Sequence, residues 1–175
     1  MKKVFAFMIA SLVLASCSSE QRPTPLGSAS SDSASSYVGQ TFPQIDLIDF
    51  QTETASTSDD QVRGKVVNFW ASWCEPCRRE FPLMANSASA KDIVAINVND
   101  LSQSDEGKTQ AEQLVALGNN SLSVWIDSAN VIPTKLSLVG LPITVAVDSN
   151  GVIVDSQIGE LHQDSLDRLL KAAQK

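Results

Sequence analysis

The sequence is poor in the residues that bind metals and nucleic acids. It contains one His and three Cys among 175 residues, and 13 Lys and Arg stand against 20 Asp and Glu, for a formal net charge of −7. One His and three Cys are too few for a zinc ribbon or for a scaffold held by several disulfides. A nucleic-acid-binding protein needs a basic surface, which this balance disfavours. We therefore expect no metal, no cofactor and no nucleic-acid partner, and the positions of the cysteines become the main evidence.

Long apolar runs are also missing, apart from one at the N-terminus. Residues 4–15 are apolar except for Ser11 and follow a basic start. A helix of that length covers roughly 18 Å, well short of the ~30 Å hydrocarbon core of a bilayer. The run is therefore typical of a secretory signal peptide rather than of a permanent membrane span.

The apolar run ends in Leu14-Ala15-Ser16-Cys17, which resembles the lipobox of bacterial lipoproteins. This resemblance implies that residues 1–16 are removed and that Cys17 carries the lipid, whose two acyl chains anchor a protein more stably than one. Residues 18–36 contain eight Ser, two Pro and one Gly, so residues 17–36 are expected to form a lipidated Cys and a Ser/Pro-rich tether. The mature protein would then be extracytoplasmic, where thiols tend to oxidise. A plain signal peptide with a chance Cys is the alternative.

Composition and periodicity predict one domain over residues 37–175. Hydrophobic residues make up 43% and charged residues 19%, which are ordinary globular values. Strands alternating with helices, followed by a hairpin, indicate an α/β fold with a mixed sheet covered on both faces. Residues 51–63 are predicted to be a polar connection, and Asn150-Gly151 to supply the positive φ angles of the hairpin turn. The predicted elements are strands at 45–50, 65–70, 93–98 and 122–126, helices at 76–88, 105–117, 130–138 and 164–173, and a hairpin of 143–147 with 152–154.

Cys74 and Cys77 are three residues apart, where the strand at 65–70 gives way to the helix at 76–88. The N-terminal end of a helix has free N–H groups and positive potential, which stabilise a thiolate, the attacking form of Cys. Pro76 suits the first turn of a helix, because an N–H is not needed there. The second Cys, one turn later, can close a disulfide with the first. With Trp73 in front, this pattern predicts a redox-active pair.

The stretch VVNFWASWCEPCRREFP, residues 66–82, resembles the active-site segment of the TlpA/ResA group of thioredoxin-like proteins. Gly140-Leu141-Pro142-Ile143-Thr144 resembles the group's cis-proline loop, residues 148–159 resemble its last hairpin, and the similarity spans about residues 38–172. The resemblance implies a thioredoxin-like α/β fold, with a mixed central sheet flanked by helices on both faces and a helix-bearing insertion at about 99–122. It also implies membrane-tethered thiol–disulfide exchange, usually in the reducing direction.

The same resemblance implies roles for individual residues. Cys74 is the nucleophile and Cys77 the resolving thiol, while Trp73 shields the sulfurs. Pro142 is the cis proline that holds an extended substrate strand against the site. An enzymatic role therefore requires that the sulfur of Cys74 be reachable and that Pro142 be cis and beside it.

Two acidic residues match positions of the ResA branch, namely Glu75 and Glu80. The chain departs from its relatives at Ile143, where the family commonly has Thr, and this alters the substrate groove. It also has Asn68 where thioredoxin has a buried Asp, so no proton relay passes through that position. Glu80 is our candidate substitute.

Glu75 lies between the two cysteines and bears on the direction of transfer. At ~6 Å its charge would oppose a thiolate by about 0.7 kcal/mol in water and ~2.8 kcal/mol at an effective dielectric of 20. A less stabilised reduced form is a stronger reductant. Arg78 and Arg79 act in the opposite sense, unless they point to solvent. The sequence therefore favours a reductase, with a thiol oxidase of the same fold as the alternative.

An extracytoplasmic reductase needs electrons from inside the cell. We expect a transmembrane thiol electron-transfer protein as donor, exported proteins with disulfides or thiols as clients, and a monomer held at the membrane through its lipid. Candidate clients are apocytochrome c, oxidised methionine sulfoxide reductases and misoxidised secreted proteins. A different class of function is a surface lipoprotein that uses the fold as a binding module, with a merely structural Cys pair. His162 is expected at the entry of a helix, and Trp70 and Trp125 in the core.

Overall fold

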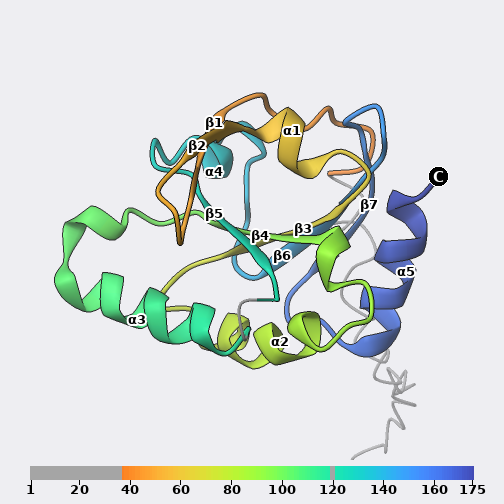
Figure 1. Cartoon of the computed structure of the whole chain (residues 1–175). Coiled ribbons are helices and arrows are strands. Elements are labelled where there is room, and N and C mark those ends of the chain that lie inside the picture. The colour runs from red at the N-terminus through yellow and green to blue at the C-terminus, as the bar shows by residue number, and fades with distance from the viewer. Residues whose placement is uncertain (1–36, 119–120) are drawn as a thin grey trace, which may run out of the picture.

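The computed structural model describes residues 37–118 and 121–175 of the chain (Figure 1). The expected signal peptide, Cys17 and the tether lie outside the described residues. Within the described part, no helix is both long enough and apolar enough to cross a bilayer.

One seven-stranded sheet organises the domain, in the order β2-β1-β5-β4-β3-β6-β7. β3 is parallel to β4, and β4 to β5, whereas β6 is antiparallel to both β3 and β7. The sheet is therefore mixed, as predicted. Its strands are β1 Asp46–Asp49, β2 Ala55–Thr57, β3 Val66–Trp70, β4 Ile93–Asn97, β5 Ser123–Ile126, β6 Ile143–Val147 and β7 Ile153–Ile158.

Helices cover both faces of this sheet (Figure 1). The helices are α1 Ser58–Val62, α2 Glu75–Ala85, α3 Asp105–Ala116, α4 Ile132–Lys135 and α5 Gln163–Ala173, with short 3₁₀ turns η2 Ala90–Asp92 and η3 Leu101–Gln103. α2, α3 and α5 lie on one side, and α1 and α4 lie on the other. The expected insertion between β4 and β5 contains η3 and α3.

The two faces of the sheet have separate cores because side chains of a strand alternate. Val66 and Trp70 of β3 belong to a cluster with Phe81 and Met84 of α2 and the apolar side of α5. Phe69, from the same strand, points into the opposite cluster. Every residue of β3, β4 and β6 is buried, which explains why their sequences are apolar except for one polar residue in each strand.

The predicted polar connection at 51–63 is wrong, because β2 and α1 lie there. β2 has no apolar residue larger than Ala and is held by main-chain pairing to β1, such as Asp46 with Thr57. α1 has only five residues and buries Ser58 and Val62. Neither element leaves a periodic apolar pattern in the sequence.

The structure adds detail to two further predictions, one for residues 130–138 and one for the β6–β7 turn. The helix or helical turn expected at 130–138 is the short helix Ile132–Lys135, and Asn130 and Ser137 on either side of it have φ of 51° and 54°. In the β6–β7 turn only Gly151 has a positive φ, of 82°, and not Asn150 as well. The Asp148 carboxylate shapes that turn instead, by accepting bonds from the N–H groups of Asn150 and Val152.

Candidate active site

The two cysteines lie where β3 ends and α2 begins, and they are joined in a disulfide with a Cα–Cα distance of 5.3 Å. Cys74 is the N-cap of α2, and its Sγ accepts a hydrogen bond from the Cys77 N–H at 3.3 Å. Pro76 occupies the first turn, where a missing N–H leaves no helical bond unmade. The helix terminus therefore directs N–H groups at Cys74, as the spacing predicted.

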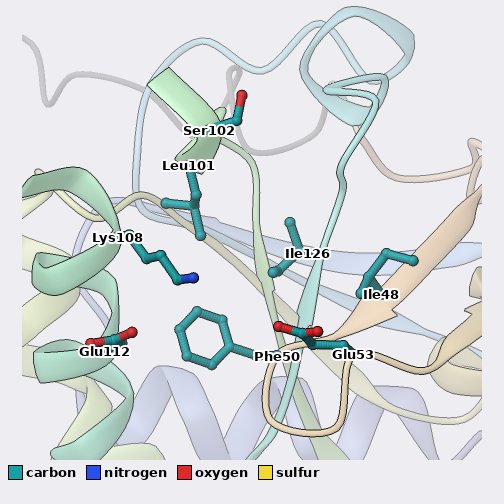
Figure 2. Close-up of a pocket in the computed structure, with 8 residues that line it drawn as sticks. All are labelled: Ile48, Phe50, Glu53, Leu101, Ser102, Lys108, Glu112 and Ile126. Carbon is teal, nitrogen blue, oxygen red and sulfur yellow. The ribbon is translucent and has the colours of Figure 1, made fainter. Parts of the chain in front are cut away.

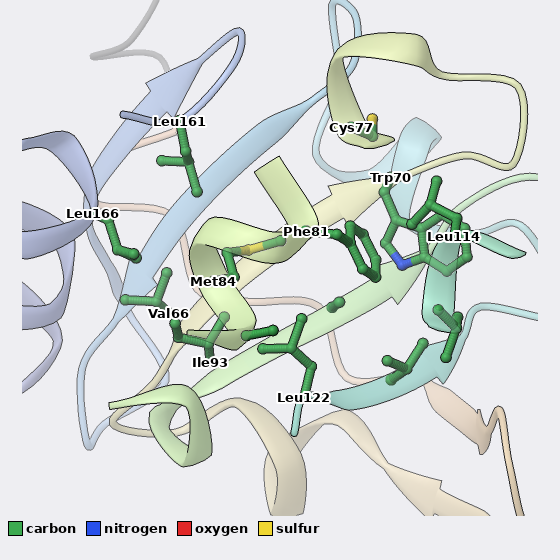
Figure 3. Packing of buried hydrophobic residues seen from close by; sticks show 14 of the residues in the cluster. Val66, Trp70, Cys77, Phe81, Met84, Ile93, Leu114, Leu122, Leu161 and Leu166 are labelled. Carbon is green, nitrogen blue, oxygen red and sulfur yellow. The ribbon is translucent and has the colours of Figure 1, made fainter. Parts of the chain in front are cut away.

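The two sulfur-bearing residues differ in their surroundings. Cys77 is 0% exposed and belongs to the cluster that contains Trp70 and Phe81 (Figure 3). Cys74 is 3% exposed and belongs to the same cluster, so the expectation of a solvent-reachable sulfur is not met in this oxidised form, although the residue lines a surface hollow. This Cys74 hollow, of about 180 Å³, is lined by Ser72, Trp73, Cys74, Glu75, Arg78 and Gln110. Of the two cysteines, only Cys74 therefore lines this hollow.

Trp73 is an exposed aromatic side chain of the site, at 67%. The Leu141–Pro142 bond is cis, as the motif implied. Gly140 and Leu141, just before that bond, share a second hollow of about 250 Å³ with Trp73. We call it the apolar hollow, because its remaining walls are Val98, Asn130, Pro133 and Leu138. The cis-proline loop therefore lies next to the segment that carries Cys74.

Glu80 lies one turn after Cys77 on α2 and is buried. Its Oε1 accepts a bond of 2.7 Å from Asn68 Nδ2, and its Oε2 accepts a bond of 2.8 Å from the Leu161 N–H. Burial raises the pKa of Glu80 to about 7, although these two hydrogen bonds act in the lowering direction. The carboxyl group can therefore exchange a proton near neutral pH.

The hydrogen bonds that Asn68 makes in the site were not predicted from the sequence. Besides Glu80, its amide donates a bond of 2.9 Å to Thr144 Oγ1, two residues beyond Pro142. Asn68 thus joins the Glu80 carboxylate to the strand that follows the cis-proline loop. One feature of the sequence could have indicated these bonds: Asn68 is a single amide in an otherwise apolar strand. A buried amide needs a hydrogen-bonding partner.

Glu75 is on the outer side of the same turn and is largely exposed. Arg78 Nε lies 3.7 Å and Arg79 Nη1 lies 4.0 Å from its carboxylate oxygens, so the arginines do not simply point to solvent. Arg79 bonds more closely to Glu160, with Nη2–Oε2 at 2.6 Å. The charge of Glu75 is therefore only partly offset, mainly by Arg78.

A further hollow, which we call the remote hollow, is lined by residues of β1, β5, η3 and α3 and of the loop after β1 (Figure 2). It has a volume of about 490 Å³, and its lining includes neither cysteine nor Trp73. Phe50, Leu101 and Lys108 line it together with Ile48, Glu53, Ser102, Glu112 and Ile126. No group of His, Cys, Asp and Glu suited to holding a metal occurs among residues 37–118 and 121–175.

The other residues named in the sequence analysis are a helix N-cap, His162, and two buried tryptophans, Trp70 and Trp125. His162 is the N-cap of α5, and its N–H donates to Ser165 Oγ at 3.0 Å. Trp70 and Trp125 are buried, as predicted.

Comparison with known proteins agrees with this arrangement. A family model described as Redoxin matches residues 37–170. The thiol-disulfide oxidoreductase ResA of Geobacillus kaustophilus is 27% identical over 140 residues, which cover 77% of each chain. A crystal structure from Chlorobium tepidum, named as a thiol:disulfide interchange protein DsbE, superposes with a TM-score of 0.60 at 26% identity, covering 79% of this chain and 98% of that one. The exposed lipoprotein thioredoxin Etrx1 of Streptococcus pneumoniae shares the fold, with a TM-score of 0.59 at 21% identity over 74% of this chain and 98% of that one.

Proposed function

This chain belongs to the Redoxin family and is a thiol–disulfide oxidoreductase, and from that premise we propose that it reduces disulfides of exported client proteins while anchored outside the cytoplasmic membrane. The observation that carries the proposal is the position of Cys74 at the N-terminus of α2, beside a surface hollow and bonded to Cys77. The oxidised form described here is the product state of such a reduction.

The reaction needs two exchanges. In the reduced protein the Cys74 thiolate attacks one sulfur of a client disulfide, so that a Cys74–client bond forms and one client thiolate leaves. Cys77 then loses its proton and attacks Cys74 Sγ, which forms the Cys74–Cys77 disulfide and releases the second client thiolate. Two electrons pass to the client, and an external dithiol must return two electrons to the protein.

The lining of the Cys74 hollow supports the order in which the two sulfurs would react. Cys77 has no exposed surface, so a client cannot meet it first, whereas Cys74 borders the Cys74 hollow. The Cys77 N–H and the end of α2 favour negative charge on Cys74. Trp73 lines the Cys74 hollow, and the cis bond before Pro142 would present the preceding main chain to an extended client strand.

Glu80 takes the proton of Cys77 in this mechanism. It follows Cys77 by one turn on the same helix, and its pKa of about 7 allows it to accept a proton at neutral pH. The bonds from Asn68 and Leu161 keep the ionised carboxylate in place until the proton arrives. In this mechanism Glu80 replaces the buried Asp of thioredoxin as the proton acceptor.

The reducing direction rests on Glu75. Its carboxylate is next to Cys74 in sequence and opposes the thiolate, while Arg79 is engaged chiefly by Glu160. Less stabilisation of the dithiol form makes the protein a better electron donor. The reduction potential against glutathione tests this: a value near −250 mV or lower supports a reductase, and one near −120 mV indicates an oxidase.

The location rests on the N-terminal sequence. Lipidated Cys17 would hold the domain near a transmembrane thiol electron-transfer protein that reduces it, and the domain would act as a monomer. The pneumococcal neighbour is named as an exposed lipoprotein, so the fold is compatible with that location. Replacing Cys17 with Ser should move the protein from the membrane fraction to the soluble fraction; membrane retention of that variant would contradict the anchor.

Insulin reduction with dithiothreitol tests the chemistry itself. Cys74→Ser should abolish the acceleration over dithiothreitol alone, because it removes the attacking sulfur. Cys17→Ser is the matched control, because it removes the remaining cysteine and should leave the rate unchanged. Equal rates for Cys74→Ser and the unmodified protein would favour the binding-module alternative. Trapping with Cys77→Ala, which leaves clients bonded to Cys74, would identify the clients.

A further inference from the structure

The helix of the insertion, α3, contributes directly to the surroundings of the reactive sulfur. Gln110 of α3 lines the Cys74 hollow, opposite Glu75 and Arg78 of α2. Its side-chain amide donates a bond of 3.2 Å to Glu106 Oε1, and its carbonyl oxygen has no partner among the described residues. An unpaired carboxamide oxygen beside Cys74 can accept a bond from the main chain of a bound polypeptide.

The segment between β4 and η3, which leads to α3, is joined to the site by polar contacts. Asn99 Oδ1 accepts a bond of 2.9 Å from the Ser72 N–H and another of 2.9 Å from Asn97 Nδ2. A Cβ placed on Gly107 would lie 3.7 Å from Ser72 Oγ, so the first turn of α3 lies against the segment that precedes the cysteines. Ala111 and Leu114 of α3 are buried in the cluster that contains Trp70, so the helix that carries Gln110 is packed onto the domain.

A larger polar hollow of about 450 Å³ continues from the Cys74 hollow. The two share Ser72, Trp73 and Gln110. This insertion-side hollow is lined further by Asn99, Asp100, Gln103, Ser104, Glu106 and Gly107, which include two acidic residues and no basic one. The apolar hollow also contains Trp73, but its other walls are mostly hydrocarbon. The surface next to Cys74 is thus acidic and polar towards α3, and apolar towards the cis-proline loop.

We propose that α3 is a client-specificity element, in which Gln110 binds the client main chain next to the cysteine bonded to Cys74. In this arrangement the insertion-side hollow receives a Lys or Arg side chain of the client, and the apolar hollow receives an apolar one. The occupant is therefore an extended polypeptide with a basic residue on one side of its cysteine and an apolar residue on the other. The proposal rests on Cys74 being the client-binding sulfur and holds for either direction of electron transfer.

The test uses peptides whose single cysteine is activated as a 2-thiopyridyl disulfide. The protein carries Cys77→Ala, so that the reaction stops at the mixed disulfide, and Cys17→Ser, so that Cys74 is its only thiol. Attack by Cys74 joins the peptide to the protein and releases 2-thiopyridone, whose absorbance gives the rate. Dipyridyl disulfide, which carries no peptide, reports the reactivity of Cys74 alone.

Peptides with Lys beside the cysteine should react faster than matched Glu peptides, by about 2- to 10-fold at low ionic strength and less in high salt. Glu106→Lys should reverse this preference. Glu112→Lys is the matched control, because Glu112 lies on the same helix but lines the remote hollow (Figure 2). Gln110→Ala should slow all peptides by about 3- to 10-fold, the loss of one hydrogen bond, and leave the dipyridyl disulfide rate unchanged.

The opposing outcomes are distinct. Equal effects of Glu106→Lys and Glu112→Lys would mean that only the overall charge matters, and would overturn the proposal. Gln110→Ala slowing dipyridyl disulfide as much as the peptides, or slowing neither, would also overturn it. Failure of dipyridyl disulfide to react with the parent protein would instead contradict the role of Cys74 in the proposed function.

Discussion

The first turns of α2 have an outer and an inner side, and each carries one glutamate. Glu75, on the outer side, is largely exposed and has Arg78 and Arg79 within 4.0 Å. Glu80, on the inner side, is buried with one amide and one main-chain N–H as donors and no cation. Burial on the inner side raises the pKa of Glu80 to about 7, whereas the carboxylate of Glu75 is exposed to solvent. In the mechanism that we propose, helical position, and not residue type, separates the glutamate that tunes Cys74 from the glutamate that exchanges a proton with Cys77.

The strongest test of this comparison is Glu80→Gln. In reduced Cys17→Ser protein, dipyridyl disulfide should release one thiopyridone as Cys74 attacks and a second as Cys77 closes the disulfide. Loss of the proton acceptor should slow the second phase by about 100-fold at neutral pH, a magnitude typical of general base catalysis. It should also remove the rise of that rate with pH, whose midpoint we expect near 7 in the parent protein.

Glu75→Gln is the control for that experiment, because it removes the exposed carboxylate of the same helix. Its second phase should keep the pH dependence. If both variants slow the second phase alike, the two sides of α2 do not have different roles.

A second test concerns stability and requires no client. The pKa of Glu80 is about 7 when folded and near its ordinary value of 4.5 when unfolded, so the folded protein binds the proton more tightly. The stabilisation is complete below pH 4.5 and is lost as the pH rises through about 7, by about 3 kcal/mol in total. The free energy of unfolding of the oxidised protein should therefore fall from pH 5 to pH 8 by more than in Glu80→Gln. Parallel curves for the two proteins, measured by urea unfolding, would contradict the raised pKa.

The smallest effect should come from Glu75→Gln on the reduction potential. Removing the carboxylate removes its opposition to the Cys74 thiolate, by about 0.7 kcal/mol if solvent and Arg78 screen it. The potential should become more oxidising by about 15 mV, since 1.4 kcal/mol corresponds to 30 mV for two electrons. Equilibration with glutathione measures the change, and a shift towards more reducing values would reverse our assignment of the role of Glu75.

The features of the site that depend on residues close together in the sequence could be predicted. The strand, the N-cap position of Cys74, Pro76 in the first turn and the core position of Trp70 all follow from a few consecutive residues. The cis bond before Pro142 followed from a resemblance to known proteins and not from spacing.

What could not be predicted depends on contacts between distant residues. The bond from the Leu161 N–H to Glu80 joins positions 81 residues apart, and it is a main-chain group, which leaves no mark in the sequence. Gln110 could be assigned to the expected insertion, but only the packing of α3 against Ser72 places it beside Cys74. β2 was missed for a similar reason, because pairing with β1 rather than apolar periodicity makes it a strand.

Trp73 is the one exposed tryptophan, since Trp70 and Trp125 are both buried. An indole in water emits at longer wavelength than one in a core, so the red edge of the protein's intrinsic fluorescence originates mostly from Trp73. Disulfides quench nearby indoles, and Trp73 is directly adjacent to Cys74 in the chain. The molecule therefore carries its own optical reporter, which can follow both the oxidation state of the cysteine pair and the arrival of a client without any attached dye.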